Sequence, residues 1–242
     1  YYPAHLWRNE ERIDLGGNRA GARGIYSHDV LVEEVLRFVR EAADAPFFLY
    51  APFTIPYAGL DVPEDSMAPY LGKFTETPSE QQGRYISQPT PRAAFAGMVS
   101  RLDRDVGRVV DLVDHLGLKE RTLIIFSSDN GPHQEGGADP EFFGSRGGLR
   151  GFKRDLYEGG IRVPMIARWP GKIAARSETR TPVSSVDIFP TLLEAADLPL
   201  PADPPIDGKS LLGLMEGGED PVREGLFWHF PHYRGTDATP YS

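Results

Sequence analysis

Apolar residues recur at helical spacing in three parts of the chain, and short apolar runs lie between and after them. The predicted helices cover residues 29–45, 95–117 and 185–196. The predicted strands cover residues 47–51, 122–128, 163–169 and 226–230. Helices that alternate with short apolar strands indicate an α/β fold. The β-branched run at 122–128 is typical of a fully buried strand in a parallel sheet.

The residues between these elements have the composition of loops. Residues 1–27 are polar and rich in glycine and arginine, and residues 198–221 are also loop-like. Asp29 is the predicted N-cap of the first helix, and Gly117 is a suitable stop for the second. The proline-rich residues 52–91 form a long irregular segment, and segments of this kind in compact domains are usually functional or mobile.

Composition and charge exclude several classes of function. The formal charge is −9, from 35 acidic and 26 basic residues, which argues against a nucleic-acid-binding surface. The absence of cysteine excludes disulfides, thiolate zinc sites and a cysteine nucleophile within this chain. No apolar run has the length of a membrane span. The composition indicates neither the oligomeric state nor the redox compartment.

The two ends of the sequence indicate an internal fragment of a longer protein. The chain starts at Tyr1 without an initiator Met or the basic-then-apolar pattern of a signal peptide, and residues 239–242 have no helix stop or tail character. We therefore expect residues 1–242 to be part of one catalytic domain, with residues 198–242 as the start of a C-terminal subdomain.

Asp129, Asn130 and Gly131 follow the predicted strand at 122–128. Ligand sites in parallel α/β sheets lie beyond the carboxyl ends of the strands. A carboxylate and an amide carbonyl placed there are hard oxygen donors suited to Ca²⁺ or Mg²⁺. The alternative is an ordinary Asn-Gly turn, although the next β-like run lies far downstream.

Lys153 lies in a glycine-rich segment, Gly147–Lys153, that is followed by the Glu-Gly-Gly turn at 158–160. Such a loop can bring a lysine ammonium close to an anion. The alternative is a solvated loop lysine. The surrounding glycines favour a functional role.

Taken together and in order, these motifs resemble the sulfatase family of the alkaline-phosphatase-like superfamily. The segments that carry the resemblance are 46–50, 54–56, 102–107, 128–133, 149–153, 157–164, 186–191 and 207–211. The resemblance covers nearly the whole chain and implies an α/β sheet sandwiched by helices. In this chain the fold would be incomplete, with its N-terminal part and extreme C-terminus missing.

The resemblance also implies a function and site residues. Asp129 and Asn130 match a pair that helps bind a divalent cation, usually Ca²⁺, with Mg²⁺ as the alternative. Lys153 matches an active-site lysine that contacts the sulfate ester and its leaving oxygen. The expected substrate is an aryl or carbohydrate sulfate, and the expected location is periplasmic or secreted.

Two departures from the family pattern stand out. The formylglycine motif, Cys/Ser-x-Pro-x-Arg, and the paired aspartates that precede it do not occur in this chain. We expect both to lie upstream, so that the fragment alone is inactive; a degenerate relative that lost catalysis is the alternative. Tyr57 stands where the family usually has a histidine that contacts the sulfate group, and it is a candidate for substrate binding. Its hydroxyl can form hydrogen bonds but cannot act as an imidazolium near neutral pH, so either Tyr57 is a weaker anion contact or the substrate geometry differs.

Three histidines are further candidates for substrate binding. His133 follows Asn130 closely and either lines the pocket or is an ordinary loop residue. His229 and His232 lie in a segment that resembles a region near the family's substrate entrance, and packing is the alternative for both.

The sequence is also compatible with two other functions. A phosphate or phosphonate ester hydrolase of the same superfamily would carry a Thr nucleophile upstream, where a sulfatase has Cys or Ser. A non-catalytic, metal-stabilised binding module would lack both the nucleophile and the paired aspartates.

Overall fold

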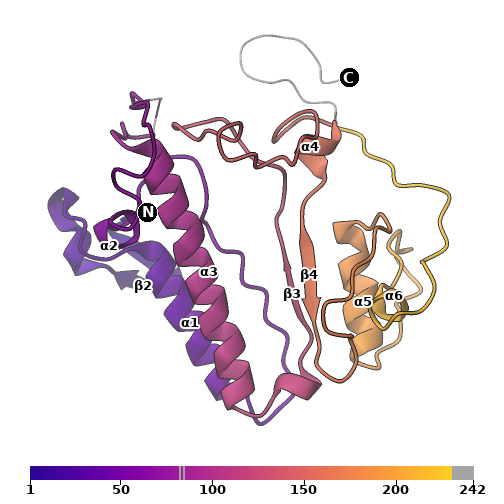
Figure 1. The fold of residues 1–242 in the computed structure, drawn as a ribbon. Helices are drawn as coiled ribbons and strands as arrows, with labels where there is room; N and C mark the ends of the chain where they lie inside the picture. The colour runs from indigo at the N-terminus through magenta and orange to yellow at the C-terminus, as the bar shows by residue number, and fades with distance from the viewer. Residues whose placement is uncertain (82, 84, 231–242) are drawn as a thin grey trace.

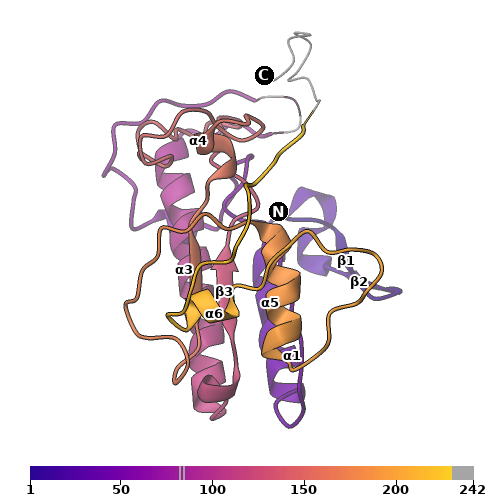
Figure 2. The ribbon, with the colours of Figure 1, turned by 90° about the vertical axis from the view of Figure 1, so that its right-hand side faces the viewer.

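Two helix layers flank a narrow β-ribbon (Figure 1). The computed structural model describes residues 1–81, 83 and 85–230. One layer holds α1 (Ser27–Glu41) and α3 (Pro91–His115), the ribbon is made of β3 (Ile124–Ser127) and β4 (Met165–Arg168), and the other layer holds α5 (Ile188–Ala195) and α6 (Leu212–Met215). Figure 2 shows the same order of layers from the side of α5. This arrangement matches the predicted α/β fold with helices on both sides of a sheet.

The N-terminal segment contains regular structure, so the prediction that residues 1–27 form only a loop is wrong. β1 (His5–Arg8) and β2 (Glu11–Asp14) form an antiparallel hairpin in which Arg8 pairs with Glu11. The tight turn contains Asn9 at φ 54°, a conformation that asparagine tolerates better than most residues. The remaining short elements are 3₁₀ helices η1 (Gly16–Gly21), η2 (Lys119–Arg121) and η3 (Ser185–Asp187), and helices α2 (Glu64–Met67) and α4 (Glu158–Ile161).

Helix α1 has the predicted apolar face but begins two residues before the predicted cap. Val32, Leu36 and Val39 are buried on this face. Asp29 lies inside the first turn, and its carboxylate accepts hydrogen bonds from Arg101 of α3, at 2.8 Å from Nε and 2.6 Å from Nη2. Asp29 therefore joins two helices instead of capping one.

Helix α3 is the longest helix, and it ends where the sequence predicted. Pro91 occupies its first turn, and Gly117 follows its end at φ +70°. One face packs Ala94 and Met98 into a cluster of buried apolar side chains with Leu60. In the described part of the chain, none of the helices is both long and apolar enough to cross a bilayer.

The strands differ from the prediction in direction and in number. β3 pairs with β4 antiparallel, with Ile124 opposite Arg168 and Ser127 opposite Met165, and the residues of β3 are only partly buried. An apolar run predicts that both faces of a strand are covered, but it carries no information about the direction of the partner strand. Residues 47–51 and 226–230, predicted as strands, are not in strands here. The predicted subdomain boundary near residue 198 stays a prediction.

Glycines allow two backbone segments to touch beside the end of β3. The Gly131 N–H donates to the Gly160 carbonyl at 2.9 Å, and the Lys153 N–H donates to the Pro132 carbonyl at 2.8 Å. A Cβ atom on Gly131 would lie 1.9 Å from the Gly159 carbonyl oxygen. A side chain at this position is therefore incompatible with the contact.

A buried histidine joins α1 to α3. His28 Nε2 lies 3.1 Å from Asp105 Oδ2, and both side chains are fully buried. Asp105 also accepts hydrogen bonds from Arg104 and Arg108, which hold its pKa low despite burial. Burial lowers the pKa of His28 below its ordinary value of 6.5, with Asp105 acting in the opposite direction.

The pKa of His28 predicts that acid destabilises the helix pair. Because the folded-state pKa lies below that of the unfolded chain, the unfolded state binds more protons as pH falls through 6.5, and the free energy of unfolding decreases. Each unit of pKa difference corresponds to about 1.4 kcal/mol. Urea denaturation between pH 8 and pH 5 measures this slope. We expect His28→Asn to flatten it and the exposed His115→Asn to leave it unchanged; an equal slope in both variants would contradict the assignment.

The close contact at Gly131 predicts that a single methyl group added there lowers the stability of the protein. Gly131→Ala forces the two segments apart and should lower the free energy of unfolding by about 1–3 kcal/mol. Gly107→Ala on α3 is the matched control, since a Cβ there meets no atom within 4 Å, and helix propensity should raise stability by about 0.5–1 kcal/mol. Denaturant titration compares the two, and equal effects would show that the contact is not tight.

Candidate functional site

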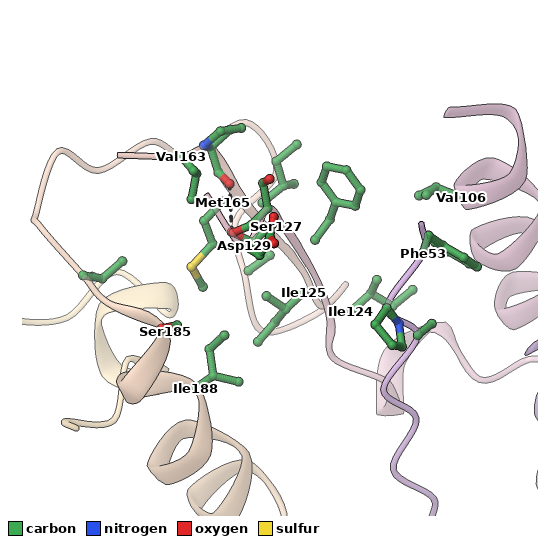
Figure 3. Close-up of a pocket in the computed structure, with 18 of the residues that line it drawn as sticks. Phe53, Val106, Ile124, Ile125, Ser127, Asp129, Val163, Met165, Ser185 and Ile188 are labelled. Atoms are coloured by element: carbon green, nitrogen blue, oxygen red, sulfur yellow. Dashed lines mark hydrogen bonds between the residues drawn. The ribbon is translucent and has the colours of Figure 1, made fainter. Parts of the chain in front are cut away.

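Asp129 and Asn130 follow the carboxyl end of β3, and their side-chain oxygens are available to bind another group. The Asn130 side-chain nitrogen donates to the Gly131 carbonyl at 2.9 Å, so the amide oxygen is left for another partner. Ser128 Oγ donates to the Asn130 carbonyl at 3.0 Å and shapes the turn. Asp129 is exposed, and its carboxylate forms no hydrogen bond or ion pair within the described residues. Figure 3 shows Asp129 at the rim of a cleft, beyond Ser127.

Lys153, Tyr57 and His133 come together although they are far apart in the sequence. The Lys153 Nζ atom lies 4.6 Å from the centroid of the Tyr57 ring. The Tyr57 and His133 rings are 5.6 Å apart at an angle of 50°. These residues were predicted separately, one as catalytic and two as substrate-binding, and the structure brings them into one cluster beside the end of β3.

His133 is held in one orientation, and its surroundings keep its pKa below the ordinary value of 6.5. Its Nδ1 atom accepts the Glu135 backbone N–H at 3.3 Å, which places the proton of the neutral ring on Nε2. Burial lowers the His133 pKa; Lys153 acts in the same direction and Glu135 opposes it. Within the described residues Nε2 has no hydrogen-bond partner.

An ion pair between Glu135 and Arg154 lies beside this cluster. Neither residue was predicted as part of a site, because an acid and an arginine in separate loops give no spacing signal. The pair borders His133 through Glu135 and Lys153 through Arg154. One Glu135 oxygen is buried without a hydrogen-bond partner in the described part of the chain.

Asp129 and Asn130 carry side-chain oxygens of the kind that a hard cation takes. Ca²⁺ takes six to eight oxygen ligands, and Asp129 and Asn130 offer a carboxylate and an amide oxygen of the required kind. In residues 1–81, 83 and 85–230 no group of three or more His, Asp or Glu side chains could hold a metal ion. The pair therefore fits a hard cation only if further ligands are added.

The predicted residues of the site line one large cleft. Asp129, Asn130, Lys153, Tyr57 and His133 all border it, as does the exposed His229. The remaining predicted histidine, His232, lies outside the described residues.

Comparisons with known proteins identify relatives of this chain. A family model described as Sulfatase matches residues 3–198. A sulfatase of Formosa agariphila is 34% identical over 260 residues, which cover 100% of this chain and 44% of the relative. Human steryl-sulfatase is 34% identical over 202 residues, which cover 83% of this chain and 31% of the relative. The chain thus spans less than half the length of either relative.

Solved structures share the fold of this chain. The structure of Ps i-CgsB in complex with k-i-k-neocarrahexaose superposes with a TM-score of 0.63 at 29% identity, covering 80% of this chain and 40% of that one. A structure of BT4656 with D-glucosamine-2-N,6-O-disulfate has a TM-score of 0.70 at 17% identity, covering 100% of this chain and 60% of that one, which supports the fold alone. With the family model matched over residues 3–198, this chain belongs to the sulfatase family.

Proposed function

We propose that the full-length protein hydrolyses sulfuric esters of the aryl or carbohydrate class. The observation that carries the proposal is the backbone contact between the Asp129–Asn130 turn and the lysine loop. The hydrogen bond from Lys153 N–H to the Pro132 carbonyl, at 2.8 Å, ties a lysine to two oxygen donors. A cation and an ammonium on adjacent loops suit a substrate with several anionic oxygens.

In this proposal Lys153 contacts the sulfate group and its leaving oxygen. Its ammonium is supported by the Tyr57 ring at 4.6 Å, and no acidic side chain in the described residues forms a salt bridge with it. Its charge can therefore offset negative charge that develops on the leaving oxygen in the transition state. Tyr57 occupies the position of the usual histidine. Its ring supports the Lys153 ammonium, and its hydroxyl contacts the anion.

Asp129 and Asn130 would hold the divalent cation, Ca²⁺ or Mg²⁺, through their side-chain oxygens. The cation would supply Lewis-acid polarisation of the sulfate oxygens. The other cation ligands and the formylglycine nucleophile would come from polypeptide outside residues 1–242. On this proposal residues 1–242 alone do not turn over substrate, and the periplasmic or secreted location remains an expectation.

Removal of the lysine charge tests the assignment of Lys153. We expect Lys153→Ala in the full-length protein to lower kcat/KM for a chromogenic aryl sulfate by roughly 10²–10³-fold. Lys172→Ala is the matched control, since Lys172 also stacks over an aromatic ring, at 4.3 Å from the Trp169 centroid. Turnover like the wild type in Lys153→Ala would remove Lys153 from the site. Greater turnover of the matching phosphate ester by the wild type would favour phosphoryl transfer instead.

Replacement of a carboxylate tests the cation site. Asp129→Asn removes one negative charge and should weaken Ca²⁺ binding at least about tenfold, which corresponds to 1.4 kcal/mol. Calorimetric titration of the full-length protein with CaCl₂ measures this without substrate. Asp103→Asn, at an exposed position on α3, should bind Ca²⁺ like the wild type. Equal affinity of both variants would place the cation elsewhere.

A further inference from the structure

Lys153 lies in a tight turn whose next residue, Arg154, has an unfavourable backbone conformation. The Asp155 N–H donates to the Phe152 carbonyl at 2.9 Å, and the Asp155 carboxylate accepts the Phe152 N–H at 2.9 Å. Between them Arg154 has φ 81°, a left-handed conformation that favours glycine and strains other residues. Strained residues of this kind persist where surrounding contacts hold them, and they gather at functional sites. The contacts of Arg154 therefore bear on the position of Lys153.

The Arg154 guanidinium forms an ion pair with Glu135, which lies in the loop that follows Asn130. The Glu135 side chain is 25% exposed and the Arg154 side chain 37% exposed, so water screens this pair only in part. Lys153 and Arg154 border the cleft, whereas Glu135 is absent from its described lining. Glu135 thus lies behind the residues that face the cleft, where it holds other side chains and does not contact a substrate.

The backbone around Glu135 holds two further members of the site. The Glu135 N–H donates to His133 Nδ1 at 3.3 Å and orients the imidazole ring. The next residue, Gly136, packs on the segment that carries Tyr57, since a Cβ atom on Gly136 would lie 2.6 Å from the Gly59 backbone nitrogen. Three loops therefore meet at Glu135, and only its carboxylate reaches the turn of Lys153.

A second ion pair in the same loop has no such connection. Glu141 pairs with Arg146, but the Glu141 side chain is 60% exposed and neither residue borders the cleft. Exposed pairs of this kind usually contribute little to stability. The two pairs thus differ in what they hold, which makes Glu141 a matched control for Glu135.

We propose that the Glu135–Arg154 ion pair is a positioning device for the Lys153 ammonium. The pair holds the strained corner of the turn at residues 152–155, while the Glu135 backbone holds His133. Without the pair the corner is released, and the Lys153 Nζ atom leaves its place over the Tyr57 ring. A displacement of about 1 Å in a group that contacts the reacting atoms lowers turnover by up to about 10²-fold.

The inference rests on the proposed sulfate-ester function for its kinetic test, whereas the binding of inorganic sulfate tests it without turnover. Glu135 and Arg154 are positioning residues, because they act through Lys153. Substitution of Glu135 by alanine keeps the backbone N–H that holds His133, so the variant isolates the role of the carboxylate.

A double-mutant cycle in the full-length protein tests the pair. We expect Glu135→Ala and Arg154→Gly each to lower kcat for a chromogenic aryl sulfate by about 10–10²-fold. The double variant should be no slower than the slower single variant, because both substitutions remove the same contact. Glu141→Ala should turn over like the wild type. Effects of the two substitutions that multiply in the double variant would overturn the proposal.

Thermal unfolding separates positioning from simple support of the fold. Glycine adopts φ 81° without steric cost, so Arg154→Gly should have the wild-type Tm or a higher one although its kcat falls. Arg154→Lys keeps a cation for Glu135 and should recover most of the wild-type kcat. A Tm that falls together with kcat in Arg154→Gly, or an Arg154→Lys variant as slow as Arg154→Gly, would show that the pair does not position Lys153.

Calorimetric titration with Na₂SO₄ supplies the readout that is independent of turnover. Glu135→Ala and Arg154→Gly should each weaken sulfate binding at least about tenfold, and Glu141→Ala should bind like the wild type. Equal sulfate affinity in the wild type and in Glu135→Ala would overturn the proposal. A wild type that binds sulfate in this Glu135-dependent way but hydrolyses no sulfate ester would contradict the proposed function and support the positioning role.

Discussion

The approach of two backbone segments at Gly131 and Gly160 is the contact on which the candidate site depends. The loop between residues 131 and 157 contains no helix or strand. The position of Lys153 relative to Asp129 is therefore not fixed by regular secondary structure. Two backbone hydrogen bonds fix it, each with a net value of about 1 kcal/mol. The absence of side chains on the glycines lets these bonds form at close range. The glycine-rich composition is thus a geometric requirement of the site.

The layer of α1 and α3 is held together without the sheet. Arg101 and Asp29 form a two-point ion pair across the helices, and the buried pair of His28 and Asp105 lies near it. The Arg101 side chain is only 6% exposed, so the loss of Asp29 would leave its buried guanidinium with Asp65 as its ionic partner. The polar contacts that join α1 to α3 therefore do not involve the β3–β4 ribbon.

Periodicity was sufficient for the long helices and insufficient for the strands. The spacing of Val32, Leu36 and Val39 predicted α1, since apolar residues that recur at this period form one face only in a helix. The β1–β2 hairpin was missed because residues 5–14 are mostly polar and exposed, so that no apolar face marks them. The antiparallel pairing of β3 and β4 depends on a partner distant in the sequence, which an apolar run does not specify.

The candidate site was predictable in its members but not in its assembly. The motifs pointed to Asp129, Asn130, Lys153 and Tyr57, and their resemblance to a family gave each a role that stays a prediction. No spacing rule predicts that the Lys153 ammonium lies over the Tyr57 ring, because several loops separate the two residues in the sequence. The Glu135–Arg154 pair was also out of reach, since loop geometry alone brings its two charges together.

The stacking of Lys153 on Tyr57 has an electrostatic consequence. A carboxylate neighbour would cancel the ammonium charge at a distance, leaving a dipole whose field decays quickly. An aromatic ring carries no net charge, so it steadies the ammonium by about 0.5–1 kcal/mol while the full positive charge still reaches into the cleft. In a chain with a formal charge of −9, Lys153 is thus a cation without a salt-bridged acidic partner in the described residues. An anion held within a Debye length of Lys153, about 8 Å at physiological salt, therefore meets an ammonium that no acidic side chain of the described residues neutralises through a salt bridge.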